Sequence, residues 1–291
     1  MPAGSTATSS ELRAALMGVR AFILDADGVL MYRNEPIAGS PAAIVALRER
    51  EIPYRVVTNF SSAHRSSLAA AFGKAAGIPV DHNEIITAAS AAAAYTAKHF
   101  AGAPLLVLAA PDAKREWAGQ ELLSPAEADA RPEPVAAVVI GDAGDDLSYA
   151  NLDIAFRQLR AGAAFVAMHR NPWWMTPKGF TLDAGAIVAG LEFALDRHAM
   201  ICGKPSPVVF RQALAELRAE CTVGIVESRL RAADVAMVGD DPRADVAAAK
   251  RVGLRGFLVL SGKSSADAAY ASRVAPDAIA ADLASIVAAL P

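Results

Sequence analysis

Seven short apolar runs, each separated from the next by a stretch that favours helix, limit most strongly what this chain can fold into. They lie at residues 21–24, 54–57, 105–108, 135–140, 164–168, 235–238 and 256–260. Runs this short and this apolar are typical of strands buried on both faces. Because strands that alternate with helices form parallel sheets, we expect an α/β fold. A chain of 291 residues is long enough for one large domain or two moderate ones.

Two serine–proline pairs mark predicted helix starts. Ser40 and Ser206 each offer a side-chain oxygen as an N-cap, and the prolines that follow suit the first helical position. Alanine is abundant throughout the chain and blurs the amphipathic pattern of the helices. These two pairs are therefore among the clearest helix boundaries that the sequence offers.

Composition and charge exclude several classes of protein. The formal net charge is −3 and the 28 basic residues are scattered, which argues against a nucleic-acid partner. No apolar stretch approaches the roughly 18 residues that a membrane span needs, and residues 1–10 lack the pattern of a secretory signal. Cys202 and Cys221 lack metal-ligand spacing, and so few cysteines do not indicate disulfides. We therefore expect neither a nucleic-acid nor a membrane partner, and a cytoplasmic location.

The tetrapeptide Asp-Ala-Asp-Gly at residues 25–28 directly follows the first apolar run. It places two carboxylates at the carboxyl end of a buried strand, where α/β proteins bind ligands. One interpretation is an ordinary turn, because Asp and Gly are common there. The other is catalytic: Asp25 attacks phosphorus, Asp27 handles the proton, and a hard cation such as Mg²⁺ screens carboxylate from phosphate. The tetrapeptide alone does not decide between them.

Two further positions offer groups that can hold phosphate oxygens. Thr58 and Asn59 follow the run 54–57 and provide a hydroxyl and backbone amides. Lys204 precedes Pro205, which biases it away from helical geometry, and its ammonium can neutralise phosphate charge. Taken singly, an ordinary turn and a solvated lysine explain them equally well. They indicate a phosphate site only in combination with the other motifs.

Three carboxylates gather after the run 235–238, at Asp240, Asp241 and Asp245. Such clustering at one strand end suits a Mg²⁺ site. The alternative is an acidic helix start, in which aspartates cap the helix and favour its dipole. We prefer capping for Asp241 and metal binding for Asp240. Asp142 also follows an apolar run, so this position is not sufficient to predict a ligand, and we assign Asp142 to a middle subdomain.

In chain order, these motifs resemble the four motifs of the haloacid dehalogenase (HAD) superfamily of phosphohydrolases. The residues that carry the resemblance are Asp25-Ala26-Asp27-Gly28, Thr58-Asn59, Gly203-Lys204-Pro205 and Gly239-Asp240-Asp241 with Asp245. The wide gap between the second and third motifs resembles the large α/β cap of the NagD-like, p-nitrophenylphosphatase-like branch, as do residues 182–186 and 203–207. The resemblance implies a Rossmann-like parallel-sheet core of residues 1–88 and 198–291, with an inserted α/β cap domain at residues 89–197.

The resemblance also implies a reaction. A Mg²⁺-dependent phosphatase of this kind hydrolyses a small-molecule phosphate monoester through an aspartyl-phosphate intermediate, here on Asp25. The implied roles are Asp25 as nucleophile, Asp27 as general acid and base, Thr58, Asn59 and Lys204 as phosphate binders, and Asp25, Asp27 and Asp240 as metal ligands. In this family the second aspartate binds the metal through its backbone carbonyl. The supporting residues are Gly28, Asp241 and Asp245.

Substrate choice is expected to reside in the cap. Residues 168–174 follow a predicted cap strand, and our hypothesis is that His169 and Arg170 contact the leaving group. The alternative is that Trp173 and Trp174 pack in the cap core or in a dimer interface, as large aromatic side chains usually do. Cap-mediated dimers occur in such relatives, so a homodimer stays open.

The sequence is also compatible with other classes of protein. One is a non-enzymatic phosphate-binding or receiver-like regulatory module, but in receiver domains the acidic pair and the phosphorylated aspartate lie on separate strands. Here Asp25 and Asp27 follow a single strand. Phosphotransferases and dehalogenases share the fold, although a dehalogenase would not need Asp27 or the metal cluster. Two departures from the family pattern, Phe60 and a longer stretch at residues 218–233, touch none of the proposed catalytic groups.

Overall fold

The computed structural model describes residues 6–33, 35–176, 179–221, 230–265 and 273–291. The chain divides into two compact units. The first, which we call the core, comprises Met1–Thr58, Ser66–Ile86 and Lys204–Pro291. The second, the cap, comprises Asn59–Arg65 and Thr87–Gly203. The boundaries expected from the sequence, after residues 88 and 197, lie close to these, but they place residues 59–65 in the core. Residues 222–229 of the longer stretch before the fourth motif lie outside the described residues.

A six-stranded sheet forms the centre of the core, in the order β15–β14–β13–β1–β4–β5. Its strands are β1 (Ala21–Leu24), β4 (Tyr54–Thr58), β5 (Ile85–Thr87), β13 (Val235–Gly239), β14 (Arg255–Val259) and β15 (Ala278–Ala280). The pairings from β15 through β4 are parallel. Every residue of β1 and β13 is buried, as apolar runs of this length predict. The predicted parallel α/β core is confirmed.

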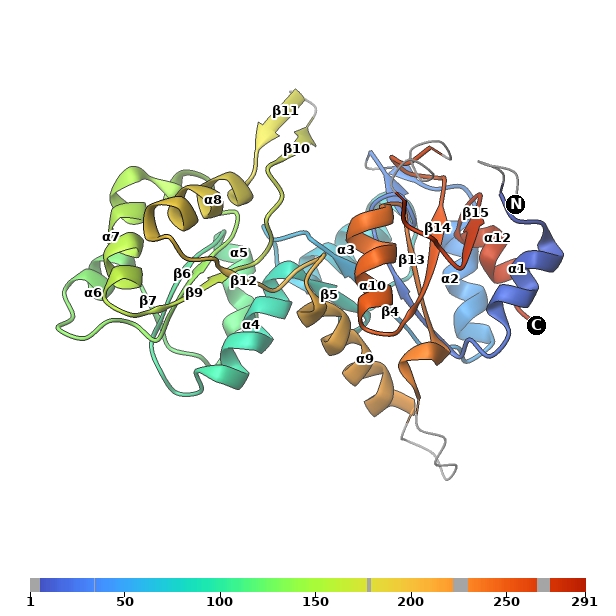
Figure 1. The fold of residues 1–291 in the computed structure, drawn as a ribbon, viewed down its shortest axis with the longest axis horizontal. Helices are drawn as coiled ribbons and strands as arrows, with labels where there is room; N and C mark the ends of the chain where they lie inside the picture. The colour runs from blue at the N-terminus through green and yellow to red at the C-terminus, as the bar shows by residue number, and fades with distance from the viewer. Residues whose placement is uncertain (1–5, 34, 177–178, 222–229, 266–272) are drawn as a thin grey trace. The chain divides into compact units, whose positions relative to one another are not determined.

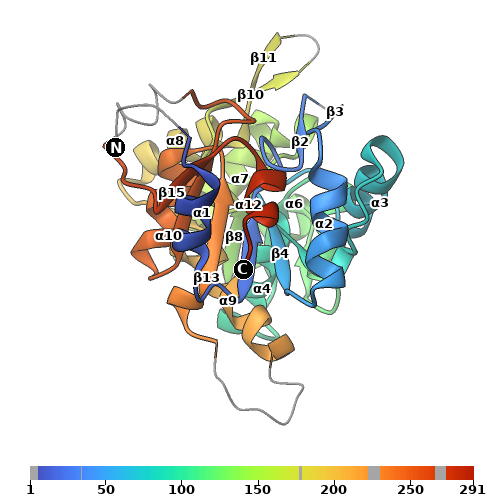
Figure 2. The same ribbon diagram turned by 90° about the vertical axis from the view of Figure 1, so that its right-hand side faces the viewer.

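Helices cover both faces of the core sheet (Figures 1 and 2). One face carries α1 (Ser9–Leu16), α2 (Ser40–Glu49) and α12 (Leu283–Ala288). There Leu16 and Ile44 pack against Phe22 of β1 in one apolar cluster. The other face carries α9 (Pro207–Cys221) and α10 (Ala248–Arg251). The remaining core elements are α3 (Arg65–Ala76), the hairpin β2 (Met31–Tyr32) and β3 (Glu35–Pro36), the π-helical turn Pro242–Ala247, and the 3₁₀ turns η1 (His82–Glu84) and η4 (Ala232–Asp234).

The two predicted helix starts differ in outcome. α9 begins at Pro207, and the Ser206 hydroxyl accepts a hydrogen bond from the backbone N–H of Val208 at 3.3 Å, so this N-cap is confirmed. The prediction for Ser40 is wrong, because α2 begins at Ser40 itself and Gly39 stands at the N-cap. The buried Ser40 hydroxyl instead donates to the carbonyl of Leu30 at 2.8 Å, and it thereby holds the loop that follows β1.

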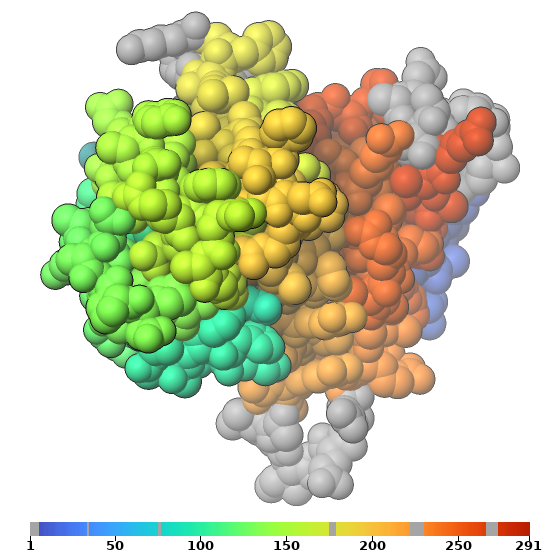
Figure 3. All heavy atoms as spheres, turned by 60° about the vertical axis from the view of Figure 1, so that its left-hand side comes forward, coloured from blue at the N-terminus to red at the C-terminus, as the bar shows by residue number. Residues whose placement is uncertain are grey.

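The cap contains a second parallel sheet, in the order β12–β9–β8–β6–β7. Its strands are β6 (Leu105–Leu108), β7 (Leu122–Leu123), β8 (Ala137–Ile140), β9 (Ala164–Ala167) and β12 (Met200–Ile201). The helices are α4 (Ala88–His99), α5 (Pro111–Lys114), α6 (Pro125–Asp129), α7 (Tyr149–Arg160) and α8 (Ala184–Leu195), with 3₁₀ turns η2 (Arg115–Trp117) and η3 (Gly144–Leu147). One apolar cluster joins one face of this sheet to α6, α7 and α8. Figure 3 shows α7, in yellow-green, at the surface of the cap.

A two-stranded antiparallel hairpin, β10 (Trp173–Thr176) and β11 (Gly179–Leu182), follows β9 in the cap. Trp173 is 54% exposed and Trp174 is 45% exposed, so the alternative that they pack in the cap core is wrong. Trp173 instead packs edge-on against Phe180 across the hairpin, with ring centroids 4.8 Å apart. Among the described residues, none of the helices has the length and apolar character needed to cross a membrane.

Candidate active site

The register of the core sheet brings the first and fourth motifs together. β1 lies between β13 and β4, and Leu24 is level with Val238 of β13. The backbone N–H of Asp25 continues this ladder by donating to the carbonyl of Val238 at 2.9 Å. Because neighbouring parallel strands end at the same edge, Asp25 lies beside the chain that leads to Asp240, with Thr58 at the end of β4 on its other side. All three of these polar residues are buried.

Lys204 is the buried cation of this site. Its Nζ lies 2.6 Å from Oδ1 of Asp25 and 2.7 Å from Oδ1 of Asp245, and the residue is 4% exposed. Oδ2 of Asp245 accepts a hydrogen bond from the Asp241 N–H at 3.0 Å. Burial lowers the pKa of Lys204, but the carboxylates of Asp245 and Asp25 outweigh burial, so the pKa lies above its ordinary value. The lysine is therefore charged and held between two carboxylates.

Burial raises the pKa values of Asp25, Asp27 and Asp240. For Asp25, burial raises the pKa, Lys204 opposes this rise and the nearby charge of Asp27 adds to it. Asp27 is exposed by surface area, but the surrounding protein still desolvates its carboxyl group and raises its pKa, against the opposing effect of Lys204. For Asp240, burial raises the pKa more than the Lys263 N–H lowers it. Each of these carboxylates would be stabilised by additional positive charge.

A loop after β14 holds Asp240 in place, and the sequence analysis did not single it out. The Lys263 backbone N–H donates to Oδ2 of Asp240 at 2.7 Å, and the Ser261 hydroxyl donates to the Gly28 carbonyl at 2.7 Å. A Cβ atom at Gly262 would lie 2.1 Å from Oδ2 of Asp240, so glycine is needed there. A signal for these residues was present, because they follow the predicted strand 256–260 as Asp240 follows its own strand.

Asp241 has the capping role that we preferred for it. Its Oδ1 accepts hydrogen bonds from the N–H groups of Arg243 and Ala244, both at 2.8 Å, at the start of the turn Pro242–Ala247. The Lys263 ammonium lies 3.0 Å from Oδ2 of Asp241 and balances its charge. Asp241 therefore shapes the loop that carries Asp240.

The donor set fits a divalent cation. Carboxylate oxygens of Asp25, Asp240 and Asp245 lie within 4.8 Å of one another, and all three residues are buried. When ionised, these three buried carboxylates face one buried ammonium, that of Lys204, and one exposed ammonium, that of Lys263, which lies 4.0 Å from Oδ1 of Asp240. One negative charge is left unbalanced. Because unbalanced buried charge is costly, a divalent cation would stabilise this cluster. Oxygen ligands of this kind are those that Mg²⁺ prefers.

The other predicted site residues lie in the cap. Asn59, although it is bonded to Thr58, belongs to the cap, and its Nδ2 donates to Oδ1 of Asn171 at 3.3 Å. His169 is 2% exposed. Arg170 is half-exposed, and its guanidinium pairs with Glu192 of α8 at 2.6 Å. The predicted site residues thus fall in both units, with Asn59, His169 and Arg170 in the cap and the others in the core.

Comparison with known proteins agrees with this architecture. Residues 22–122 match the sequence model of haloacid dehalogenase-like hydrolases, and residues 201–286 match a second, HAD-hydrolase-like model. Haloacid dehalogenase-like hydrolase domain-containing protein 2 of Mus musculus is 30% identical over 253 residues, covering 87% of this chain and 88% of the relative. The 4-nitrophenylphosphatase of Thermotoga maritima has a TM-score of 0.81 at 25% identity, covering 95% and 99% of the two chains. NagD from Escherichia coli K-12 has a TM-score of 0.77 at 27% identity, covering 91% and 97%.

The fold, the site and the relatives agree on the class of this protein. A parallel α/β core with an inserted α/β cap, in which buried carboxylates surround a buried lysine, defines a hydrolase of the phosphatase class. The chain belongs to the haloacid dehalogenase-like hydrolase family, and the structures that it resembles include the NagD and p-nitrophenylphosphatase types. The family resemblance and the fold class predicted from the sequence are both confirmed.

Gly28 offers a test of how closely the site is packed. Its φ of +79° suits glycine, and a Cβ there would lie 2.4 Å from Cγ of Asp240. We expect Gly28→Ala to displace Asp240 and to lower kcat/KM at least about tenfold, a cost of about 1.4 kcal/mol in the transition state. Gly77→Ala is the matched control, because Gly77 has φ +61° with no atom within 4 Å of its Cβ position. Equal kcat/KM in both variants, measured on p-nitrophenyl phosphate, would contradict this explanation.

Proposed function

We propose that this protein is a Mg²⁺-dependent phosphatase that hydrolyses a small-molecule phosphate monoester through an aspartyl-phosphate intermediate on Asp25. The observation that carries the proposal is the fixed position of the Asp25 carboxylate. Its Oδ1 lies 2.6 Å from Nζ of Lys204 and accepts the Ala26 N–H at 2.7 Å. Two donors on Oδ1 leave Oδ2 as the oxygen that we assign to the attack on phosphorus.

The proposed reaction has two steps on one carboxylate. In the first, Oδ2 of Asp25 bonds to phosphorus, the ester P–O bond breaks, and Asp27 donates a proton to the leaving oxygen. In the second, water attacks phosphorus, Asp27 accepts its proton, and the acyl-phosphate bond breaks to release inorganic phosphate. The raised pKa of Asp27 supports its role as the acid, because protonation then persists closer to neutral pH.

The metal and the phosphate are assigned to different residues. Asp25, Asp240 and the backbone carbonyl of Asp27 would hold Mg²⁺, as in the family. When bound, Mg²⁺ supplies positive charge that lets the carboxylate and the phosphate approach each other. Asp245 is proposed to position Lys204, because both of its oxygens accept contacts, from Lys204 and from a backbone N–H.

Lys204, Thr58 and Asn59 are proposed to bind the phosphoryl oxygens. Lys204 is charged and buried at the carboxyl edge of the sheet, which is the environment in which an ammonium contributes most to charge neutralisation. Thr58 ends β4 at the same edge. A phosphotransferase would use the same groups, whereas a receiver-like module would not need Asp27 beside Asp25.

Selection of the ester is assigned to the cap, with Arg170 as the residue that we propose to contact the leaving group. Its guanidinium is half-exposed and is held on one side by Glu192. His169, the other residue of this hypothesis, is only 2% exposed, so we assign the contact with the leaving group to Arg170 alone. An Arg170→Ala variant with an unchanged ranking of phosphate esters would remove this part of the proposal.

Metal removal tests the function directly. With p-nitrophenyl phosphate as substrate, we expect Mg²⁺-dependent turnover that falls at least about 100-fold in excess chelator, because the metal contributes several kcal/mol to the transition state. Adding Mg²⁺ back should restore the turnover.

Intact-protein mass spectrometry during turnover should detect one phosphoryl group bound to the protein. Turnover that is indifferent to the chelator would contradict the metal, and a phosphoryl group mapped to another residue would contradict the intermediate on Asp25.

A further inference from the structure

Residues 59–65, which we call the phosphate segment, begin directly after Thr58 and belong to the cap. We propose that Glu116 and His169 are positioning residues that fasten the two ends of this segment to the cap. The proposal rests on the proposed function in one respect, namely that Thr58 and Asn59 bind the phosphate. Neither Glu116 nor His169 is assigned a contact with the reacting atoms.

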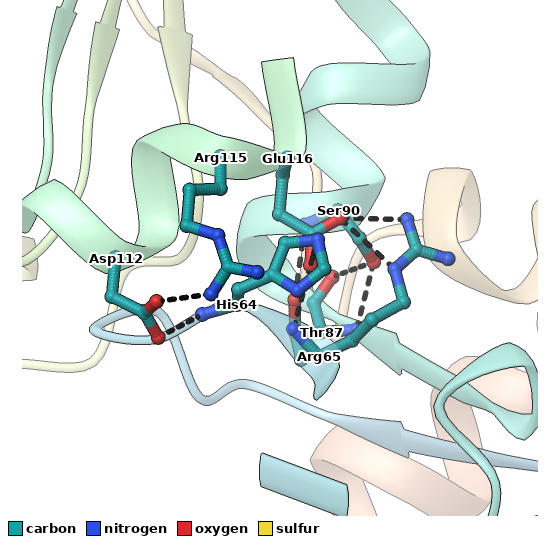
Figure 4. A network of polar contacts seen from close by, with 7 residues as sticks. All are labelled: His64, Arg65, Thr87, Ser90, Asp112, Arg115 and Glu116. Carbon is teal, nitrogen blue, oxygen red and sulfur yellow. Dashed lines mark hydrogen bonds and ion pairs between the residues drawn. The ribbon is translucent and has the colours of Figure 1, made fainter. Parts of the chain in front are cut away.

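At the far end of the segment, Glu116 of η2 binds Arg65 through three hydrogen bonds (Figure 4). Its Oε1 accepts the Arg65 backbone N–H at 2.8 Å, and its Oε2 accepts the guanidinium Nε at 2.9 Å and NH2 at 2.8 Å. The Glu116 side chain is 2% exposed. Because a buried carboxylate that loses its partner is strongly destabilised, breaking this pair is costly. Arg65 is also the first residue of α3, where an anion is favoured by the helix dipole.

A second contact supports the same end. The His64 backbone N–H donates to Oδ2 of Asp112 at 2.9 Å, and Oδ1 of Asp112 accepts from Arg115 at 2.7 Å (Figure 4). The turn that carries Glu116 is itself fixed, because the buried Trp117 donates from Nε1 to the Thr96 hydroxyl of α4 at 2.9 Å. The segment is therefore tied to a rigid part of the cap.

At the near end, His169 binds Ser61. The Nε2 atom of His169 lies 2.9 Å from the Ser61 hydroxyl and 3.6 Å from Oδ1 of Asp183. Its Nδ1 faces the Asn171 N–H at 3.3 Å, which assigns the ring proton to Nε2. Burial lowers the pKa of His169, although Asp183 and Asp142 oppose this, so the ring is neutral and donates to Ser61. Nδ1 thus accepts from Asn171 and Nε2 donates to Ser61, so both ring nitrogens have a partner.

The two residues of the segment that precede Ser61 also have contacts within the cap. The Phe60 carbonyl accepts from the Ala88 N–H at 3.2 Å, and Asn59 donates to Asn171. A Cβ at Gly203 would lie 2.6 Å from Oδ1 of Asn59, so the chain after β12 packs directly on that side chain. The geometry thus holds the first residues after Thr58 by contacts that all come from the cap.

The test uses Glu116→Gln in the full-length protein. Losing the charge should weaken the Arg65 contact and lower the fraction of molecules in which the segment is correctly placed. Since apparent affinity falls in proportion to that fraction, we expect KM for p-nitrophenyl phosphate and the inhibition constant of inorganic phosphate to rise together, about tenfold, with a smaller change in kcat. Hydrogen exchange of peptides covering residues 59–65 should become faster. Glu127→Gln is the matched control, because Glu127 caps α6 from the same unit without contacting the segment.

His169 provides the second variant. His169→Ala should reproduce the effects of Glu116→Gln, whereas His169→Gln, which keeps an N–H donor for Ser61, should restore part of the phosphate affinity. The affinity for every ester tested should fall by the same factor, since the segment binds the phosphate group and not the leaving group. A changed ranking of esters would instead make His169 a specificity residue and overturn its role here.

The proposal and the proposed function can fail separately. If the wild-type protein does not hydrolyse p-nitrophenyl phosphate, the proposed function is contradicted. Hydrogen exchange of residues 59–65 still tests whether Glu116 and His169 hold the segment. Unchanged exchange of residues 59–65 in both Glu116→Gln and His169→Ala would overturn the proposal. If exchange becomes faster but the inhibition constant of inorganic phosphate is unchanged, the two residues hold the segment without positioning it for phosphate binding, and the proposal is overturned.

Discussion

Asp25→Asn is expected to lower turnover of p-nitrophenyl phosphate by more than about 10⁴-fold, the scale on which removing a nucleophile collapses an enzyme. The amide has nearly the shape of the carboxylate, so it can still accept the Ala26 N–H, and Lys204 keeps its contact with Asp245. What is lost is the negative charge and the nucleophilic oxygen. The measurement is kcat with saturating Mg²⁺, together with the absence of a phosphoryl adduct by intact mass.

Asp142→Asn is the control for this prediction. Asp142 lies two residues after β8 in the cap, and Asp25 lies one residue after β1 in the core, so both substitutions replace an aspartate near the end of a buried parallel strand. We expect Asp142→Asn to retain turnover within a fewfold of wild type. Comparable activity in Asp25→Asn and wild type would reject Asp25 as the nucleophile, whatever the control shows.

Lys204→Met is expected to have the second largest effect, on both stability and activity. It leaves Asp25 and Asp245 buried without their shared ammonium, and breaking a buried pair in this way costs about 3–5 kcal/mol. Turnover should fall at least about 100-fold, because charge neutralisation at the phosphate is lost. Urea denaturation in the presence of chelator measures the first effect, and kcat/KM with Mg²⁺ measures the second.

Two further variants make this prediction specific. Lys250→Met removes a half-exposed lysine paired with Asp277 at 3.1 Å, and it should cost less than about 1 kcal/mol, as surface ion pairs do. Lys204→Met combined with Asp245→Asn removes one stranded carboxylate and should recover part of the stability without recovering turnover. A double variant no more stable than Lys204→Met alone would show that the stranded carboxylate of Asp245 is not the cause of the loss.

Local pattern predicted the strands where burial was complete. Ala21–Leu24 and Leu105–Leu108 are apolar at every position and form β1 and β6 with those bounds. β5 (Ile85–Thr87) and β15 (Ala278–Ala280) are three residues long, which is too short to stand out in an alanine-rich chain. Both lie at the edges of the core sheet, where pairing with an existing strand stabilises a segment that has a weak pattern of its own.

Three of the candidate site motifs could be predicted from the sequence because each follows a strand, and the ends of parallel strands share one edge of the sheet. Asp25, Thr58 and Asp240 could be found in this way. The loop Ser261–Lys263 follows the same rule, but its shortest contacts with Asp240 are the Lys263 backbone N–H and the close approach of Gly262, and neither depends on a polar side chain that the sequence would reveal. Ser40 was predicted to be a helix N-cap because proline follows it. Its hydroxyl instead donates a hydrogen bond to the carbonyl of Leu30, ten residues earlier in the chain.

Short apolar runs that alternate with helical stretches predicted the fold class, and four short motifs in chain order carried the resemblance to the family. Both are patterns of neighbouring residues and can be found without a structure. The three-dimensional packing places Lys204 between Asp25 and Asp245, and it brings Glu116 and His169 of the cap into contact with residues 59–65. These contacts join residues 41 to 179 positions apart along the chain. Such pairings depend on how the sheets and loops pack, and no local pattern encodes them.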